Sequence, residues 1–71
     1  MIELTRINGT KIAVSPFIIE FMEETPDTII LFNSGRKMVV KEKIAVINDK
    51  IADFFAEGIR KGIEKSGLIK K

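Results

Sequence analysis

The chain is organised around residues 20–40, which read E-F-M-E-E-T-P-D-T-I-I-L-F-N-S-G-R-K-M-V-V. Two groups of turn-forming residues, Thr25-Pro26-Asp27 and Asn33-Ser34-Gly35, separate the apolar runs of this stretch. Pro presets the backbone for a turn, and Gly readily adopts the positive φ that many hairpin loops require. The stretch therefore predicts three antiparallel strands joined by two tight turns, in which Pro26, Asp27, Asn33 and Gly35 have structural roles.

The position of Gly35 predicts the register of the second of these hairpins. A three-residue loop with Gly at its last position places Phe32 opposite Arg36, and it makes one face of the hairpin mostly apolar. The opposite face mixes lysines with apolar residues, which are Ile29, Leu31 and Val39. Because neither face is polar, we expect the sheet to curl into a small barrel or to have its second face covered.

An earlier hairpin is predicted from the runs 2–7 and 11–14, with Asn8 and Gly9 as turn residues. A two-residue Asn8-Gly9 turn would place Arg6 opposite Lys11 and would divide the apolar residues between two faces. A three-residue loop at residues 8–10 instead gathers four apolar residues on one face, namely Ile2, Leu4, Ile12 and Val14. Since burial outweighs turn preference, we favour this second register or a bulge. The following Ser15-Pro16 pair resembles a helix start, but the next strand begins near Ile19, so we expect a bend.

One long helix is predicted from Lys43 to Lys65, because apolar residues and glycines recur there at steps of three and four. Such a helix spans about 33 Å, whereas strands of six residues span about 20 Å. We therefore expect its second half to extend beyond the sheet, leaving Phe55, Ile59 and Ile63 without cover within the chain. Gly58 and Gly62 either permit close packing of a second helix or mark fraying, and the sequence leaves both interpretations open.

These elements predict one α+β domain over residues 1–71. Its strand-rich part covers residues 2–41, with two hairpins joined into a curved antiparallel sheet of four or five strands. An open sheet and an SH3-like barrel are both compatible with the pattern. The helix covers residues 43–65, and residues 66–71 form a basic tail.

Composition argues against enzymatic activity. The chain has no Cys, so it lacks thiolate metal ligands. It also has no His, so it lacks the imidazole group, which is both the commonest metal ligand and the commonest general base. An acidic group at Glu20, Glu23, Glu24 and Asp27 lacks the spacing of a calcium loop, and we interpret it as a solvated strand end. We expect no catalytic residues, no cofactor, no metal and no small-molecule substrate.

Charge and hydropathy give weaker indications about partners. Twelve basic and ten acidic residues give a net charge of +2, which by itself does not indicate a nucleic-acid-binding surface. Residues 60–71 carry five basic residues and one acidic residue. We interpret this end as a solubilising tail, with a weak peripheral membrane contact as the alternative. The chain shows no signal-peptide pattern and no apolar run of membrane-spanning length, so we expect a cytoplasmic protein.

Three segments together resemble the FlbD/SwrD family of small bacterial flagellar and swarming-motility proteins. They are L-T-R-I-N-G at residues 4–9, E-E-T-P-D-T-I-I at residues 23–30 and N-S-G-R-K-M-V-V-K-E at residues 33–42. The resemblance covers residues 2 to 55, and residues 58–71 extend beyond it. It implies a non-enzymatic, cytoplasmic accessory of flagellar function that acts at the basal body or the motor stator, on the inner side of the membrane. It offers no catalytic residues.

The residues themselves predict two surfaces for protein–protein contact. One is the second sheet face with Ile29, Leu31 and Val39, and the other is the overhanging helix with Phe55, Ile59 and Ile63. Because each leaves apolar area exposed, we also expect a homo-oligomer. The alternative function is a small nucleic-acid-binding regulator of motility genes, which would use Arg36, Lys37 and the basic tail.

Overall fold

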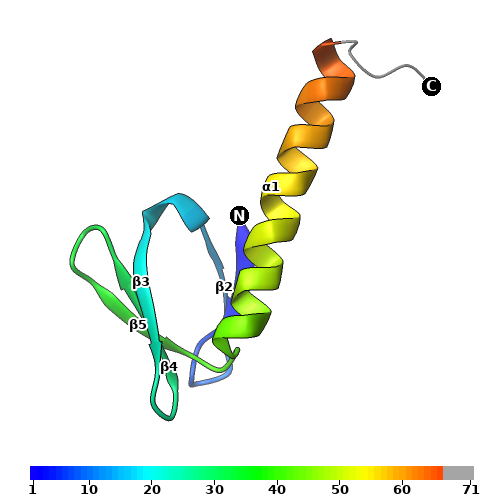
Figure 1. The fold of residues 1–71 in the computed structure, drawn as a ribbon. Coiled ribbons are helices and arrows are strands. Elements are labelled where there is room, and N and C mark those ends of the chain that lie inside the picture. The colour runs from blue at the N-terminus through cyan, green and yellow to red at the C-terminus, as the bar shows by residue number, and fades with distance from the viewer. Residues whose placement is uncertain (67–71) are drawn as a thin grey trace.

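The computed structural model describes the backbone of residues 1–66 and the side chains of residues 1–58 (Figure 1). The elements follow in the order β1 (Ile2–Thr5), β2 (Lys11–Val14), the 3-10 helix η1 (Pro16–Ile18), β3 (Ile19–Glu24), β4 (Thr28–Phe32), β5 (Lys37–Val40) and α1 (Ile44–Ser66). The predicted α+β fold and the long C-terminal helix are confirmed. At Ser15-Pro16 the chain makes a single helical turn, in which Ser15 accepts a hydrogen bond from the Phe17 amide at 3.3 Å.

The strands form two antiparallel sheets, with strand orders β1-β2 and β3-β4-β5. The expectation of one continuous sheet was therefore wrong, and no closed barrel forms within residues 1–66. The sheets touch where Arg6 bridges Val40, flanked by the hydrogen bonds Ile7 N to Val39 O (3.2 Å) and Lys41 N to Thr5 O (2.9 Å). Pairing stops there because the chain turns back toward β2 immediately after Arg6.

The register of the first hairpin also differs from the expectation. β1 and β2 pair with Leu4 opposite Ile12, so the loop consists of residues 7–9 instead of 8–10. Gly9 has a φ of +93° and donates to Arg6 O at 2.8 Å, and it therefore occupies the last loop position. The predicted apolar face is nevertheless correct. Leu4 pairs with Ile12 instead of Val14, a shift of two residues along β2, and a shift of two leaves every side chain on the same face of the hairpin. Ile2, Leu4 and Val14 are buried and Ile12 is half-buried.

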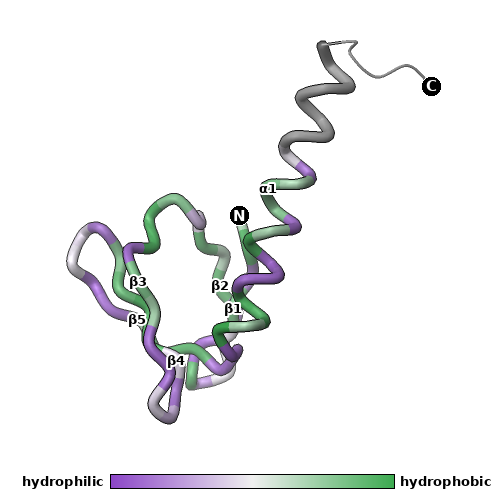
Figure 2. Tube along the Cα trace, in the orientation of Figure 1, coloured by the Kyte–Doolittle hydropathy of each residue, from purple (hydrophilic) through white to green (hydrophobic). Residues whose placement is uncertain are grey.

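The β4-β5 hairpin has the predicted register, with Ile30 opposite Met38 and Thr28 opposite Val40. Its loop repeats the geometry of the first one, because Gly35 has a φ of +91° and donates to Phe32 O at 2.8 Å. The β3-β4 turn lies at Thr25-Pro26-Asp27 as predicted, and its Thr25-Pro26 peptide bond is cis. Figure 2 shows hydrophilic residues at both loop tips of this sheet, and hydrophobic residues that are interspersed with hydrophilic ones on β3 and follow Lys37 on β5.

The core lies between the two sheets and the first turns of α1. Ile47 is fully buried, and Ile51 and Phe54 are partly buried against the same cluster. Beyond this contact α1 extends past the strands (Figure 1), which confirms the predicted overhang. The remaining buried apolar residues come from β1, β2, β4 and β5, and they are Ile2, Leu4, Val14, Ile30, Phe32 and Val40.

Candidate protein-interaction surfaces

The outer face of the three-stranded sheet is the first candidate surface. Leu31 lies opposite Phe21 on β3, and Ile29 lies opposite Val39 on β5, so these four side chains share the face that points away from the core. Ile7 extends the row, because its amide donates to Val39 O at 3.2 Å. We call this set the outer sheet face: Ile7, Phe21, Ile29, Leu31 and Val39.

The exposure of the outer sheet face is greatest at its two ends. Ile7 is 53% exposed and Phe21 is 47% exposed, whereas the three residues between them are half-buried by their neighbours. Glu23, opposite Ile29, and Lys37, opposite Leu31, place opposite charges on the same face. The surface is therefore an apolar row bordered by polar groups, which is the usual composition of a protein-binding patch.

A bulge in β3 places Phe21 on this face. The β3-β4 register shifts between Ile19 and Phe21, so Ile19 pairs with Phe32 and Phe21 pairs with Leu31. An uninterrupted strand would put Ile19 and Phe21 on the same side, because side chains alternate along a strand. The simple alternation of the sequence did not reveal this bulge, and sequence reasoning therefore missed Phe21.

A second apolar surface joins η1 to the middle of α1. The rings of Phe17, Phe54 and Phe55 contact one another edge-to-face, with centroid separations of 5.3 to 6.1 Å. Phe17 is 67% exposed and Phe55 is 40% exposed. We call these three residues the aromatic cluster. Phe55 thus has a ring contact within the chain, to Phe17 of η1, that the sequence did not predict, but it remains among the exposed apolar residues.

Asn33 anchors η1 to the sheet. Its backbone amide donates to Ile18 O at 2.8 Å, and its side-chain Nδ2 donates to Phe17 O at 3.3 Å. The predicted turn residue thus has a second role, since it also fixes the short helix that presents Phe17.

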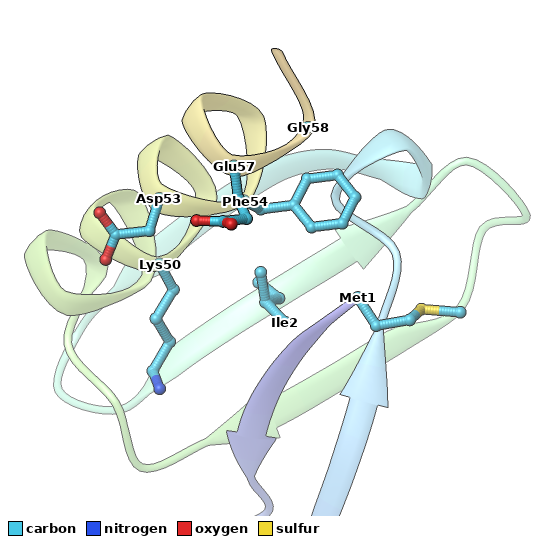
Figure 3. Close-up of a pocket in the computed structure, with 7 residues that line it drawn as sticks. All are labelled: Met1, Ile2, Lys50, Asp53, Phe54, Glu57 and Gly58. Atoms are coloured by element: carbon cyan, nitrogen blue, oxygen red, sulfur yellow. The ribbon is translucent and has the colours of Figure 1, made fainter. Parts of the chain in front are cut away.

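An open groove of about 510 Å³ runs between α1 and the start of β1 (Figure 3). Its apolar lining comes from Met1, Ile2 and Phe54, and Phe54 also belongs to the aromatic cluster. Lys50, Asp53, Glu57 and Gly58 complete the lining from the helix. The groove is therefore apolar between β1 and α1, and two carboxylates and one ammonium group line its helical side.

Two glutamates hold the start of α1 against the strands. Glu24 Oε1 accepts from the Ile44 amide at 2.8 Å, and its other oxygen lies 3.9 Å from Lys43 Nζ. A carboxylate at this point satisfies a free amide of the first helical turn and interacts favourably with the helix dipole. The interpretation of Glu24 as part of a merely solvated strand end was therefore incomplete.

Glu42 links the same region to β1. It accepts from Thr5 N at 2.9 Å and from Thr5 Oγ1 at 2.8 Å. Burial alone raises the pKa of Glu42, but the hydrogen bonds from Thr5, the backbone amide of Glu42 and the charge of Lys50 outweigh it and lower the pKa below its usual value. The deprotonated form therefore stabilises the junction between the sheets and α1.

The described residues offer little for other kinds of site. No group of three or more potential metal ligands occurs among them, and no helix within residues 1–66 has the length and apolar character of a membrane span. The side chains of Ile59 and Ile63 lie outside the described residues. Pro26, Asp27, Asn33 and Gly35 form the turns predicted for them, and Asn8 Oδ1 accepts from the Thr10 amide at 3.0 Å inside its own turn.

Comparison with known protein families gives one match. The family model described as FlbD, flagellar and swarming motility proteins, matches residues 1–58, which include the whole outer sheet face and the aromatic cluster. No curated protein and no solved structure gave a match to the chain. Because the match covers most of the sequence, the chain belongs to the FlbD family of flagellar and swarming motility proteins.

Proposed function

We propose that this chain is a non-enzymatic, cytoplasmic accessory of flagellar and swarming motility, and that it acts by binding another protein at the flagellar basal body or the motor stator. Membership of the FlbD family supports the role in motility. We infer binding to another protein mainly from the outer sheet face, where five apolar side chains adjoin one another without belonging to the core.

The physical argument rests on exposed apolar area. Ile7 and Phe21 are each about half exposed, and they lie at the ends of a row that β4 and β5 complete. Removing such a row from water is favourable at roughly 25 cal/mol for each Å² that a partner covers. Glu23 and Lys37 add opposite charges beside the row, and such charges select the orientation of a partner more than they add affinity.

The role can be tested in a strain of the source organism that lacks this chain. The proposal predicts flagella in normal number on cells that swim slowly and fail to swarm, because an accessory of the basal body or stator affects motor output. Absence of flagella would contradict it, and would direct attention to assembly or gene regulation. Unchanged motility would contradict the role in motility altogether.

The biochemical mode is tested separately on purified protein. We expect retention of this chain on immobilised stator or basal-body proteins, and no retention on RNA or DNA columns. Binding to nucleic acid that weakens steeply with added salt would contradict the proposal, since that behaviour indicates phosphate contacts.

A further inference from the structure

A cleft of about 520 Å³ opens between the two sheets. Its apolar lining comes from β2, η1, β4 and β5, and consists of Ile12, Val14, Ile18, Phe32 and Met38. Two arginines, Arg6 and Arg36, also line it, whereas no acidic residue among residues 1–58 does. We call this space the arginine cleft. Its volume lies within the range of about 300–1,000 Å³ that is usual for binding sites.

Strand pairing places both arginines on the inner face of the three-stranded sheet. Arg6 forms a bridge with Val40, which is fully buried. Arg36 lies opposite Phe32, whose amide donates to Arg36 O at 2.9 Å, and Phe32 is buried as well. Residues directly opposite each other in an antiparallel pair share a face. Both arginine side chains therefore leave the backbone on the side of the core.

Neither guanidinium group has a partner among the described side chains. No ion pair or hydrogen bond joins the guanidinium group of Arg6 or Arg36 to any of residues 1–58, and both residues are exposed. A guanidinium group carries five donors and no acceptor, and a carboxylate can accept two of these hydrogen bonds at once. The cleft is thus complementary in charge and polarity to a ligand that carries carboxylates beside an apolar group.

The spacing of the two arginines along β5 suits two carboxylates on one extended chain. Arg6 is level with Val40, so its backbone lies four residues, or about 13 Å, from Arg36 along the strand. Met38 lies midway between them on the same face, opposite the buried Ile30. In an extended peptide the side chains at positions i, i+2 and i+4 also share one face and span about 13 Å. An acidic, an apolar and a second acidic side chain at these positions match the order of Arg36, Met38 and Arg6.

We propose that the arginine cleft binds an extended acidic segment of a partner protein, in which two carboxylates flank a large apolar side chain at alternate positions and pair with Arg6 and Arg36. A ligand with a single carboxylate, such as a fatty acid, leaves one of the two cations without a counter-charge. Single-stranded nucleic acid is disfavoured because its bases stack on exposed aromatic rings, and Phe32, the aromatic residue that lines the cleft, is only 7% exposed.

Titration of the isotope-labelled full chain with a peptide, followed by NMR, tests the inference. The probe is the capped peptide Asp-Ala-Leu-Ala-Asp, and we expect it to shift the amide signals of Ile12, Arg36 and Met38. Arg6→Gln and Arg36→Gln should each weaken binding about tenfold, the usual effect of losing a charge-assisted hydrogen bond. Replacing Leu of the peptide by Ser should weaken it by a similar factor, because the apolar contact is lost.

Lys37→Gln is the matched control for the arginine variants. It removes the same charge from the same hairpin, but Lys37 lies opposite Leu31 on the outer side of the sheet. We expect it to change the Kd of the peptide by less than about twofold, since exposed charges outside the contact contribute little. Ile7→Ser/Phe21→Ser should likewise leave peptide binding unchanged, because it alters the outer sheet face only. The inference therefore does not rest on the proposed function, and either can fail without the other.

Four results would overturn the inference. The peptide shifts no signal of the cleft, or the two arginine variants bind it as well as the wild type while their spectra remain native. Lys37→Gln weakens binding as much as the arginine variants do, which would indicate a general attraction between opposite charges. Decanoate or an RNA oligonucleotide binds in the cleft more tightly than the peptide, which would assign the cleft to a different class of ligand.

Discussion

The rings of Phe17 and Phe55 lie 5.3 Å apart between centroids, at an interplanar angle of 84°, although the two residues are 38 positions apart in the chain. This edge-to-face contact links η1 to the middle of α1, beyond the buried Ile47. It therefore extends the support of the helix past the core, with Asn33 holding η1 from the other side.

The Phe17–Phe55 contact predicts a modest effect on stability. Phe17→Ala should lower the free energy of unfolding by about 1 kcal/mol, because Phe17 is mostly exposed and edge-to-face pairs contribute roughly 0.5–1.5 kcal/mol. Urea unfolding followed by circular dichroism measures it. A loss above about 3 kcal/mol would contradict this account, since a loss of that size is typical of a buried aromatic residue.

Replacing Glu24 should destabilise the start of α1. Glu24→Ala removes the acceptor of the Ile44 amide and should cost about 1 kcal/mol, the usual effect of losing a helix cap. Glu23→Ala is the matched control on the same strand, and it should change stability by less than about 0.5 kcal/mol. Equal losses in the two variants would show that the cap contributes nothing.

The lowered pKa of Glu42 predicts a pH-dependent contribution to stability. The pKa is lower in the folded state than in the unfolded chain, so between the two values the unfolded chain binds more protons and stability rises with pH. The contribution is fully present above the unfolded pKa and is lost as the pH falls through the folded one. The difference in unfolding free energy between wild type and Glu42→Gln should therefore shrink on acidification. A difference that grows as the pH falls would contradict the assignment.

Replacing the buried Thr28 by Val should stabilise the fold. Thr28 is 1% exposed, and its Oγ1 atom has no hydrogen-bond partner among the residues that the structure describes. Thr28→Val keeps the shape of the side chain and removes a buried hydroxyl, so we expect it to raise the free energy of unfolding by about 1 kcal/mol. Destabilisation by a similar amount would mean that the hydroxyl is bonded in solution.

Sequence reasoning succeeded where a local rule determined the geometry. Gly35 at the end of its loop gave the correct register for β4 and β5. The same rule applied to Gly9 gives the observed loop of residues 7–9, but the expectation placed Gly9 in the middle of the loop. The spacing of apolar residues gave the bounds of α1 to within one residue.

The features that sequence reasoning missed depend on contacts between distant residues or on an irregular backbone. The bulge that turns Phe21 outward interrupts the alternation on which strand predictions rest. The Glu24–Ile44 and Glu42–Thr5 hydrogen bonds join residues 20 and 37 positions apart, and no local pattern marks such partners. The division into two sheets likewise depends on the point, just after Arg6, at which the chain leaves β5 and turns back toward β2, and no local pattern marks that point.

The central claim, that the outer sheet face carries the role in motility, is tested most directly by swarming of the deletion strain after complementation. The variant Ile7→Ser/Phe21→Ser alters two half-exposed residues, and the matched control Val46→Ser alters a residue of α1 that is 44% exposed. At equal protein levels, we expect the wild type and Val46→Ser to restore swarming and the double variant to fail. Full restoration by the double variant, with native circular dichroism, would contradict the claim.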